Sequence, residues 1–303
     1  MRSKSTLLLF FLIQLSFGQH IIVLGTAQDG GFPHVGCQNE CQKAFDNPDL
    51  SRFVTSLAFV DQESKQWWLF EASPDMDDQL QYFSELTQGA YPYLPSGIFL
   101  THAHIGHYTG LMTLGREALG ANGVQVYALP RMIEFLKTNG PWSQLVSLGN
   151  IEPIVLAEDL AVILQEDLSV EAFTVPHRDE FSETAGFRIN KKRKSYLFIP
   201  DVDKWSKWDS NIVELVKDPV IAYAFLDATF YADGELPNRA MSEVPHPFVT
   251  ETMDLFDGES RSLKNKVIFI HFNHTNPLLF DQQTNIDVLK QGFGIAEQGK
   301  KYE

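Results

Sequence analysis

Cysteine is scarce in this chain, which has only Cys37 and Cys41, separated by three residues. Two cysteines leave room for one disulfide, which an exported protein would form. Their spacing instead suits two thiolate ligands on one helical turn, with His34 three residues upstream as a third donor. We therefore expect a structural metal site at His34, Cys37 and Cys41. A disulfide and two free thiols are the alternatives.

A long apolar run is also missing near the start of the chain. The apolar run from Leu7 to Leu15 is about half as long as the roughly 20 residues that a membrane-spanning helix needs. Arg2 and Lys4 precede it, and Gly18 follows where small residues mark cleavage. This pattern predicts a signal peptide at residues 1–18. We expect an exported protein, periplasmic or extracellular, without stable membrane association after cleavage.

Basic residues are few, because 24 Lys and Arg oppose 39 Asp and Glu, for a net charge of −15. Loss of Arg2 and Lys4 with the leader would make this −15 − 2 = −17. A surface of this sign disfavours nucleic acid as a partner. It remains compatible with a small phosphorylated or carboxylated ligand held by local metal ions. We therefore expect a small-molecule substrate, and the sequence indicates no particular oligomeric state.

Repeats and long linkers are absent from residues 19–303, where strand-like and helix-like segments alternate. This pattern and a hydrophobic content of 44% predict a single α/β domain over 19–303. The segment SLAFVDQESKQWWLFEA predicts an antiparallel hairpin, and residues 105–119 predict a helix. The run GTAQDGG resembles a phosphate-binding loop only superficially, because no Lys-Ser/Thr pair follows it.

Polar residues recur at the carboxyl ends of the predicted hydrophobic strands. In layered α/β proteins, ligands gather at that edge, because the loops converge there while the strands hold their positions. The pattern therefore predicts one shared site. The residues in question are His102, His104, His177, Asp201, Asp227 and His271.

Three histidines lie close together in the run THAHIGHYTGL, where His102, His104 and His107 follow a predicted strand. Alternating positions of an extended segment face the same side, so these side chains can turn toward one point. Neutral imidazoles are good zinc ligands, and two or three hold an ion while leaving a position open for water. Three histidines in six residues therefore predict a metal centre.

The run H-x-H-x-G-H resembles the H-x-H-x-D-H signature of the metallo-β-lactamase superfamily. Within that superfamily the chain resembles the pyrroloquinoline quinone biosynthesis protein B (PqqB) group. The resemblance implies an α/β fold, the αββα sandwich of two mixed sheets flanked by helices. It is carried, in order, by VLGTAQDGGFP, EASPDM, THAHIGHYTGLMTLGREALGA, VPHRDEFSETAGFRI, LFIPDVDKW, LDATFYADGEL and IHFNHTNPLL.

The resemblance also implies a set of metal ligands. His102, His104 and His177 correspond to a three-histidine zinc centre, and His107, Asp201 and His271 correspond to ligands of a second ion. Asp227 looks like an acid that orients a ligating histidine, and an ordinary strand-end acid that accepts loop hydrogen bonds is the alternative. Three further acids, Asp179, Glu180 and Glu183, follow His177 and are most simply solvated loop charges.

Gly106 departs from the signature, because it stands where the superfamily has the acid and supplies no carboxylate. Three outcomes follow from this change. His107, Asp201 and His271 bind a second ion weakly, His274 compensates from the same loop, or the protein holds one ion. Loss of a hard, charged ligand moves the preference toward zinc or iron and away from magnesium.

The ligand set predicts a metal-dependent hydrolase acting on a phosphodiester, lactone or related ester. Zinc, as one or two ions, would lower the pKa of bound water. Asp201 would hold the attacking water, and His271 or His274 would lie near the leaving oxygen. The resemblance implies a second possibility, an iron-dependent oxidase. Gly106, which lacks the signature carboxylate, leaves a third possibility, a metal-binding or ligand-binding protein without catalysis.

Overall fold

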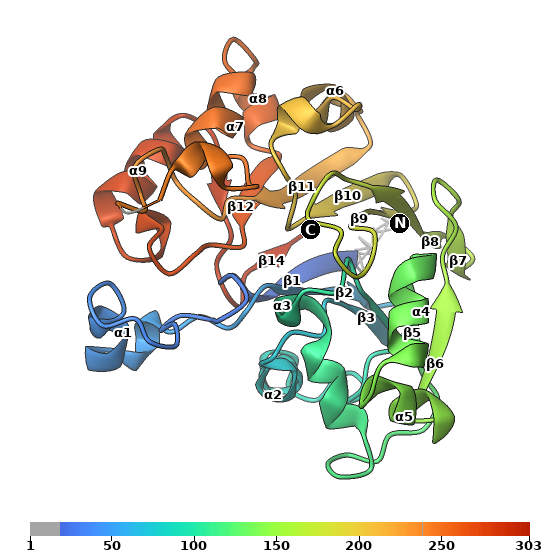
Figure 1. Ribbon diagram of the computed structural model, residues 1–303. Coiled ribbons are helices and arrows are strands. Elements are labelled where there is room, and N and C mark those ends of the chain that lie inside the picture. Colours follow the sequence, from blue (N-terminus) through green and yellow to red (C-terminus); the bar gives the residue numbers. More distant parts are fainter. Residues whose placement is uncertain (1–18, 238) are drawn as a thin grey trace, which may run out of the picture.

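The computed structural model describes residues 19–237 and 239–303, so the predicted signal peptide at residues 1–18 lies outside the described residues. Two seven-stranded sheets face each other (Figure 1). The first has the order β14-β1-β2-β3-β4-β5-β6. Its strands are β1 (Gln19–Gly25), β2 (Ser56–Asp61), β3 (Gln66–Phe70), β4 (Gly97–Phe99), β5 (Val124–Ala128), β6 (Ile151–Val155) and β14 (Lys301–Tyr302).

The second sheet has the order β13-β12-β11-β10-β9-β8-β7. Both sheets are mixed: β1 to β3 and β7 to β10 pair antiparallel, whereas β3 to β6 and β10 to β13 pair parallel. The strands are β7 (Val162–Gln165), β8 (Leu168–Thr174), β9 (Ala185–Lys191), β10 (Lys194–Ile199), β11 (Ile221–Asp227), β12 (Val267–Ile270) and β13 (Gly294–Ile295).

Helices cover the outer face of each sheet, so the layers follow the order αββα (Figure 1). The first sheet carries α2 (Met76–Leu86), α3 (Ile105–Tyr108), α4 (Pro130–Thr138) and α5 (Trp142–Ser147). The second carries α6 (Ile212–Lys217), α7 (Val249–Leu255), α8 (Arg261–Lys264) and α9 (Gln282–Lys290). The short α1 (Gln42–Asp46) projects to one side. Five 3-10 turns complete the described helices: η1 (Pro48–Leu50), η2 (Thr109–Leu114), η3 (Trp205–Lys207), η4 (Met241–Glu243) and η5 (Pro277–Leu279).

The core between the sheets is strongly aromatic. Phe70 of β3 stacks on Phe99 of β4 with ring centroids 4.9 Å apart, and it meets Phe187 and Phe198 of the other sheet edge-on. Burial of each such ring contributes roughly 1.5–3 kcal/mol. The packed core therefore fixes the position of the two sheets relative to each other, and with it the positions at which the edge loops begin and end.

The predicted hairpin is confirmed, because β2 and β3 pair antiparallel with Leu57 opposite Phe70. The predicted helix over 105–119 is shorter than expected. The backbone carbonyl of His107 accepts from Ala72 N at 3.0 Å, and Gly110 N donates to the Ala72 carbonyl at 2.9 Å. These bonds to the strand β3 end replace α-helical ones, so α3 gives way to a 3-10 turn.

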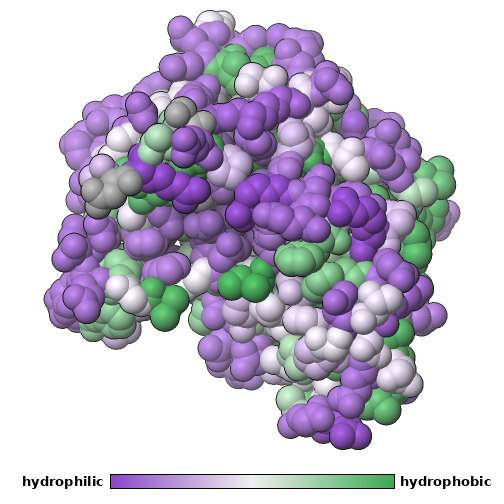
Figure 2. Space-filling view, in the orientation of Figure 1, coloured by the Kyte–Doolittle hydropathy of each residue, from purple (hydrophilic) through white to green (hydrophobic). Residues whose placement is uncertain are grey.

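The face of the molecule in Figure 2 is largely hydrophilic, and hydrophobic residues are scattered over it rather than gathered in one broad patch. Within the described part of the chain, no helix combines the length and apolar character needed to cross a bilayer.

Candidate metal centre

The site residues lie at one edge of the sandwich because the strands that carry them run in the same direction. In the first sheet, β1 and β4 end at this edge, and in the second, β8, β10, β11 and β12 do. The loops after these strands carry the predicted histidines and aspartates. The packed aromatic core fixes the strand ends, so loops distant in the sequence meet at one place.

The first group of donors joins His102, His104, His177 and Asp201, with one ligand atom of each lying within 4.8 Å of the others. Asp201 Oδ2 lies 3.3 Å from His102 Nε2 and 3.3 Å from His177 Nε2. His177 Nε2 lies 3.3 Å from His104 Nδ1. Donors about 2.0–2.1 Å from a tetrahedral zinc ion are about 3.3 Å apart, so these spacings fit such an ion.

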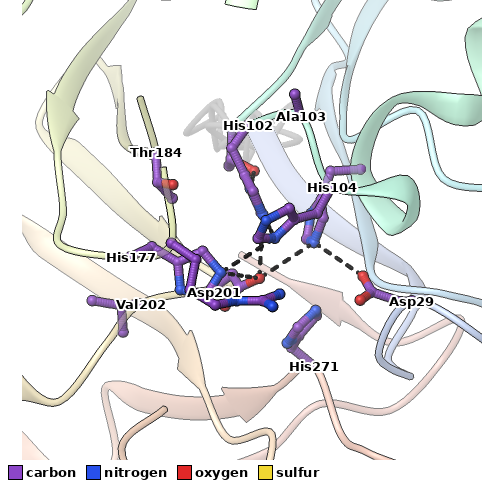
Figure 3. Close-up of polar contacts among 12 residues, drawn as sticks. Asp29, His102, Ala103, His104, His177, Thr184, Asp201, Val202 and His271 are labelled. Atoms are coloured by element: carbon purple, nitrogen blue, oxygen red, sulfur yellow. Dashed lines mark hydrogen bonds and ion pairs between the residues drawn. The ribbon is translucent and has the colours of Figure 1, made fainter. Parts of the chain in front are cut away.

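The second group joins Asp29, His107 and His271, again within 4.8 Å. His107 Nε2 lies 3.4 Å from Asp29 Oδ1 and 3.6 Å from Asp201 Oδ2. Asp201 therefore stands between the two groups. Figure 3 shows Asp29, His102, His177, Asp201 and His271 directed toward a common centre.

Partners behind the histidines fix which ring nitrogen faces the centre. His102 Nδ1 lies 2.8 Å from Thr101 Oγ1, which donates to Glu71. His104 Nε2 donates to Glu180 Oε2 at 3.0 Å. Each bond leaves the other ring nitrogen as a lone-pair donor toward the centre, which is how ligating histidines are oriented.

The same arrangement recurs at the second group. Thr229 Oγ1 donates to Asp227 Oδ1 at 2.7 Å and accepts from His271 Nδ1 at 2.9 Å. Asp227 therefore orients His271 through Thr229. His107 Nδ1 faces Glu71 Oε1 at 3.2 Å.

Inward atoms that are buried without any hydrogen-bond partner include Asp29 Oδ1, His107 Nε2 and His271 Nε2. Buried polar atoms are normally hydrogen-bonded, so convergent orphans indicate a missing partner. Imidazole and carboxylate donors are the chemistry that binds zinc or iron. The residues present therefore fit metal ions.

The backbone is strained at two of these positions. Glu71 follows β3 with φ +77°, and His271 follows β12 with φ +70°, both in the left-handed region. Residues other than glycine rarely adopt it, and such strain gathers at functional sites. Here the strained positions carry a buried acid that contacts His107 from behind and a buried imidazole directed into the second group.

His246 belongs to the site and was not predicted. Its Nδ1 lies 2.9 Å from Asp227 Oδ2 and 3.2 Å from Asp201 Oδ1. Burial lowers the pKa of His246, but the carboxylates of Asp227 and Asp201 outweigh burial and raise it overall. His246 is therefore anchored by Asp227 and lies beside the Asp201 oxygen that faces away from His102 and His177. The available sequence signal was its place in the Pro245-His246-Pro247 segment.

Glu180 also differs from its expected role as a solvated loop charge, because it orients His104. It remains 47% exposed, so its bond is screened by water. Glu180→Ala is expected to weaken binding of the first zinc ion by less than about tenfold, measured by competition with a chromogenic chelator. Glu183→Ala, which removes a neighbouring acid, is the control. A loss above about 100-fold would contradict this weak role.

His274 does not join the metal centre, which corrects the expectation that it compensates for Gly106. Its ring stacks on His34 with centroids 4.4 Å apart, beside the segment that carries the cysteines. Tertiary packing of that segment against the loop after β12 draws His274 away from His271.

The expected structural metal site at His34, Cys37 and Cys41 is also corrected. The structure joins Cys37 and Cys41 in a disulfide, one of the two alternatives. Sulfur atoms bonded to each other are not thiolates, so they do not supply the expected ligands. Cys37, Glu40 and His274 have donor atoms within 4.8 Å of one another, but the sulfur there belongs to the disulfide.

Comparison with known proteins agrees with this geometry. Residues 66–272 match the model of the beta-lactamase superfamily domain. The chain belongs to the beta-lactamase superfamily. The predicted metallo-β-lactamase fold, with two mixed sheets flanked by helices, is confirmed by this match and by the structure.

Within the superfamily, the chain is similar to coenzyme PQQ synthesis protein B of Gluconobacter oxydans (strain 621H). The two are 27% identical over 306 residues, covering 93% of this chain and 97% of that protein. The crystal structure of Zn(2+)-bound PqqB from Methylobacterium extorquens has a TM-score of 0.74 at 21% identity and covers 94% of this chain and 99% of that one. A diphosphatase from the PhnP family has a TM-score of 0.64 at 20% identity, with 93% and 96% covered. The predicted PqqB-like character is therefore confirmed, and the superfamily includes hydrolases.

Metal binding at the second group is expected to release a proton. Burial lowers the pKa of His107, but Glu71 and Asp29 outweigh burial and hold it well above its usual range in the metal-free protein. Burial holds the pKa of His102 and of His271 below the usual range, so these rings are already neutral.

A ligating imidazole must be unprotonated, so below the pKa of His107 the affinity should fall about tenfold per pH unit. Zinc titration calorimetry in buffers of different ionisation enthalpy counts the released protons. An affinity for the second ion that stays constant as the pH falls would contradict this assignment.

Proposed function

We propose that the protein is an exported, metal-dependent hydrolase that cleaves a phosphodiester, lactone or related ester. One observation carries the proposal: the inward Nε2 atoms of His102, His177 and His107, drawn from both groups, converge on Asp201 Oδ2 within 3.6 Å. A centre built in this way is preorganised before substrate arrives.

Zinc held by these donors would supply a bound water with a pKa near neutrality and would polarise the bond to be cleaved. His102, His104 and His177 would hold one ion, and His107 and His271 a second. Asp201 Oδ2 lies between the two groups, where it would accept a hydrogen bond from an attacking water. His246 lies 3.2 Å from the other Asp201 oxygen, on the side away from His102 and His177.

His271 occupies the far side of the centre, next to His107, with ring centroids 5.3 Å apart. Its Nδ1 is held by Thr229, so its Nε2 faces the second group, where an ion bound to it would stand next to the leaving oxygen of a substrate. Asp201 and His271 are therefore the residues we assign to the reaction. The substrate is a small molecule, which the acidic surface favours over nucleic acid.

Export is supported by the leader-like residues 1–18 and by the disulfide, which is typical of oxidising compartments. Sequencing the mature amino terminus after expression in a bacterium tests it. A mature chain that begins at Met1 and stays in the cytoplasm would contradict export.

Hydrolysis is tested with the zinc-loaded protein on one panel of chromogenic phosphodiesters and one of lactones. We expect turnover that a chelator abolishes and zinc restores. His104→Ala should lose it, whereas His34→Ala, a histidine outside the centre, should keep it. A zinc-replete protein that is inert on both panels would contradict hydrolysis.

Similarity to coenzyme PQQ synthesis protein B over nearly the whole chain favours a second candidate, an iron-dependent oxidase. Three histidine ligands that leave coordination positions on the metal open also suit ferrous iron. Metal analysis after anaerobic purification, combined with oxygen uptake, separates the candidates. Bound zinc without oxygen consumption supports the hydrolase, and bound iron with oxygen consumption supports the oxidase.

A further inference from the structure

Asp29 lies in the loop after β1, in the GTAQDGG run that has no place in the predicted ligand set. The loop is tied down on two sides, because Ala27 bridges both Val54 and Phe272. The second of these bridges joins it to the residue after His271. This pairing places the Asp29 carboxylate beside His107 and His271.

Gly106 explains why the carboxylate fits there. A Cβ atom built on Gly106 would lie 2.1 Å from Asp29 Oδ1 and 2.8 Å from Asp29 Cα. Such distances are far below van der Waals contact, so a side chain at position 106 and Asp29 in its present place exclude each other. The carboxylate of Asp29 therefore occupies the space where a side chain at position 106 would begin.

We propose that Asp29 is the carboxylate ligand of the second metal ion and replaces the acid that the signature has at position 106. The inference rests on the proposed metal centre and adds a ligand from a different loop. Two further observations support it: His107 and His271 are fully buried, and each directs an unpartnered Nε2 into the same group. Asp29 Oδ1 is itself buried and without a partner.

The chemistry of the side chain supports the same assignment. A carboxylate at position 29 supplies the hard, charged oxygen donor that Gly106 does not. The second position then has Asp29, His107 and His271, with Asp201 Oδ2 3.6 Å from His107 Nε2.

Metal counting tests the inference without any substrate. Wild type, Asp29→Asn and the control Asp46→Asn, an exposed acid of the same segment, are titrated with zinc and analysed for bound metal by mass spectrometry. We expect two ions in wild type and in the control. Asp29→Asn should keep the first ion and bind the second at least about 10- to 100-fold more weakly.

A double variant, Asp29→Gly with Gly106→Asp, returns the carboxylate to the signature position. We expect it to recover the second ion, whereas Gly106→Asp alone should not, because its side chain meets Asp29. Absorption of the cobalt-substituted proteins reports the change of ligand directly, and thermal melting shows that each variant is folded.

Wild-type affinity for the second ion in Asp29→Asn would overturn the inference, as would a wild type that saturates with one ion. Failure of the proposed hydrolysis looks different. A protein that binds two ions, loses one in Asp29→Asn and cleaves no substrate keeps Asp29 as a ligand and refutes only the reaction.

Discussion

Asp201→Asn is expected to weaken metal binding at both positions by more than about 100-fold, exceeding the 10- to 100-fold effect of losing a partner behind the ligands. Asp201 Oδ2 faces His102, His177 and His107 within 3.6 Å, and Oδ1 faces His246. Burial raises the pKa of Asp201, but His177 and His246 outweigh it, so the carboxylate is ionised. Replacing the carboxylate with an amide removes the negative charge that faces four imidazoles.

Zinc competition with a chromogenic chelator measures this loss, and turnover should fall with it. The matched control is Asp203→Asn, because Asp203 lies two residues away and pairs with Lys207 at 2.7 Å instead of facing the centre. Retention of both ions by Asp201→Asn at wild-type affinity would show that Asp201 does not join the two groups.

Glu71→Gln should lower the affinity for the second ion by about 10- to 100-fold and lower the pKa of His107. Glu71 is fully buried, lies 3.2 Å from His107 Nδ1 and accepts from the Thr101 hydroxyl. A neutral amide of the same shape keeps the packing but removes the charge that favours protonated His107 in the metal-free state.

Histidine NMR titration of the metal-free protein measures this pKa, and zinc calorimetry measures the affinity. Glu85→Gln, on the exposed face of α2, is the control. If the pKa of His107 and the second affinity are both unchanged, then Glu71 has a purely structural role.

The sequence pattern was sufficient to predict an α/β domain and to group much of the proposed donor set, and the family resemblance implied the αββα sandwich. Strands that run in the same direction place the residues that follow them at the same edge of a sheet. His102, Asp201 and His271 could therefore be grouped from the strand ends alone. The close spacing of the three histidines predicted that a metal ion binds there. These inferences depend on short-range pattern, which a sequence displays directly.

Other parts depend on tertiary contacts that local pattern does not contain. Asp29 meets Gly106 only because the loops after β1 and β4 come together. His246 reaches Asp201 only because its loop pairs with the residues that follow β11. The backbone of Glu71 is left-handed, a conformation that residues other than glycine rarely adopt, so no sequence pattern indicated it. The predicted helix over 105–119 is shorter than expected for a similar reason, since the His107 carbonyl and the Gly110 amide bond to Ala72 instead.

The placement of the second group has a consequence for the order of folding. Asp29 and His271 are 271 − 29 = 242 residues apart, and His107 lies between them. Closing a loop of this length precedes any gain from the contact, so this group should assemble late. During synthesis, nearly the whole chain must leave the ribosome before the donors can meet. A cell would therefore load the second ion into a nearly finished molecule rather than use it to start folding.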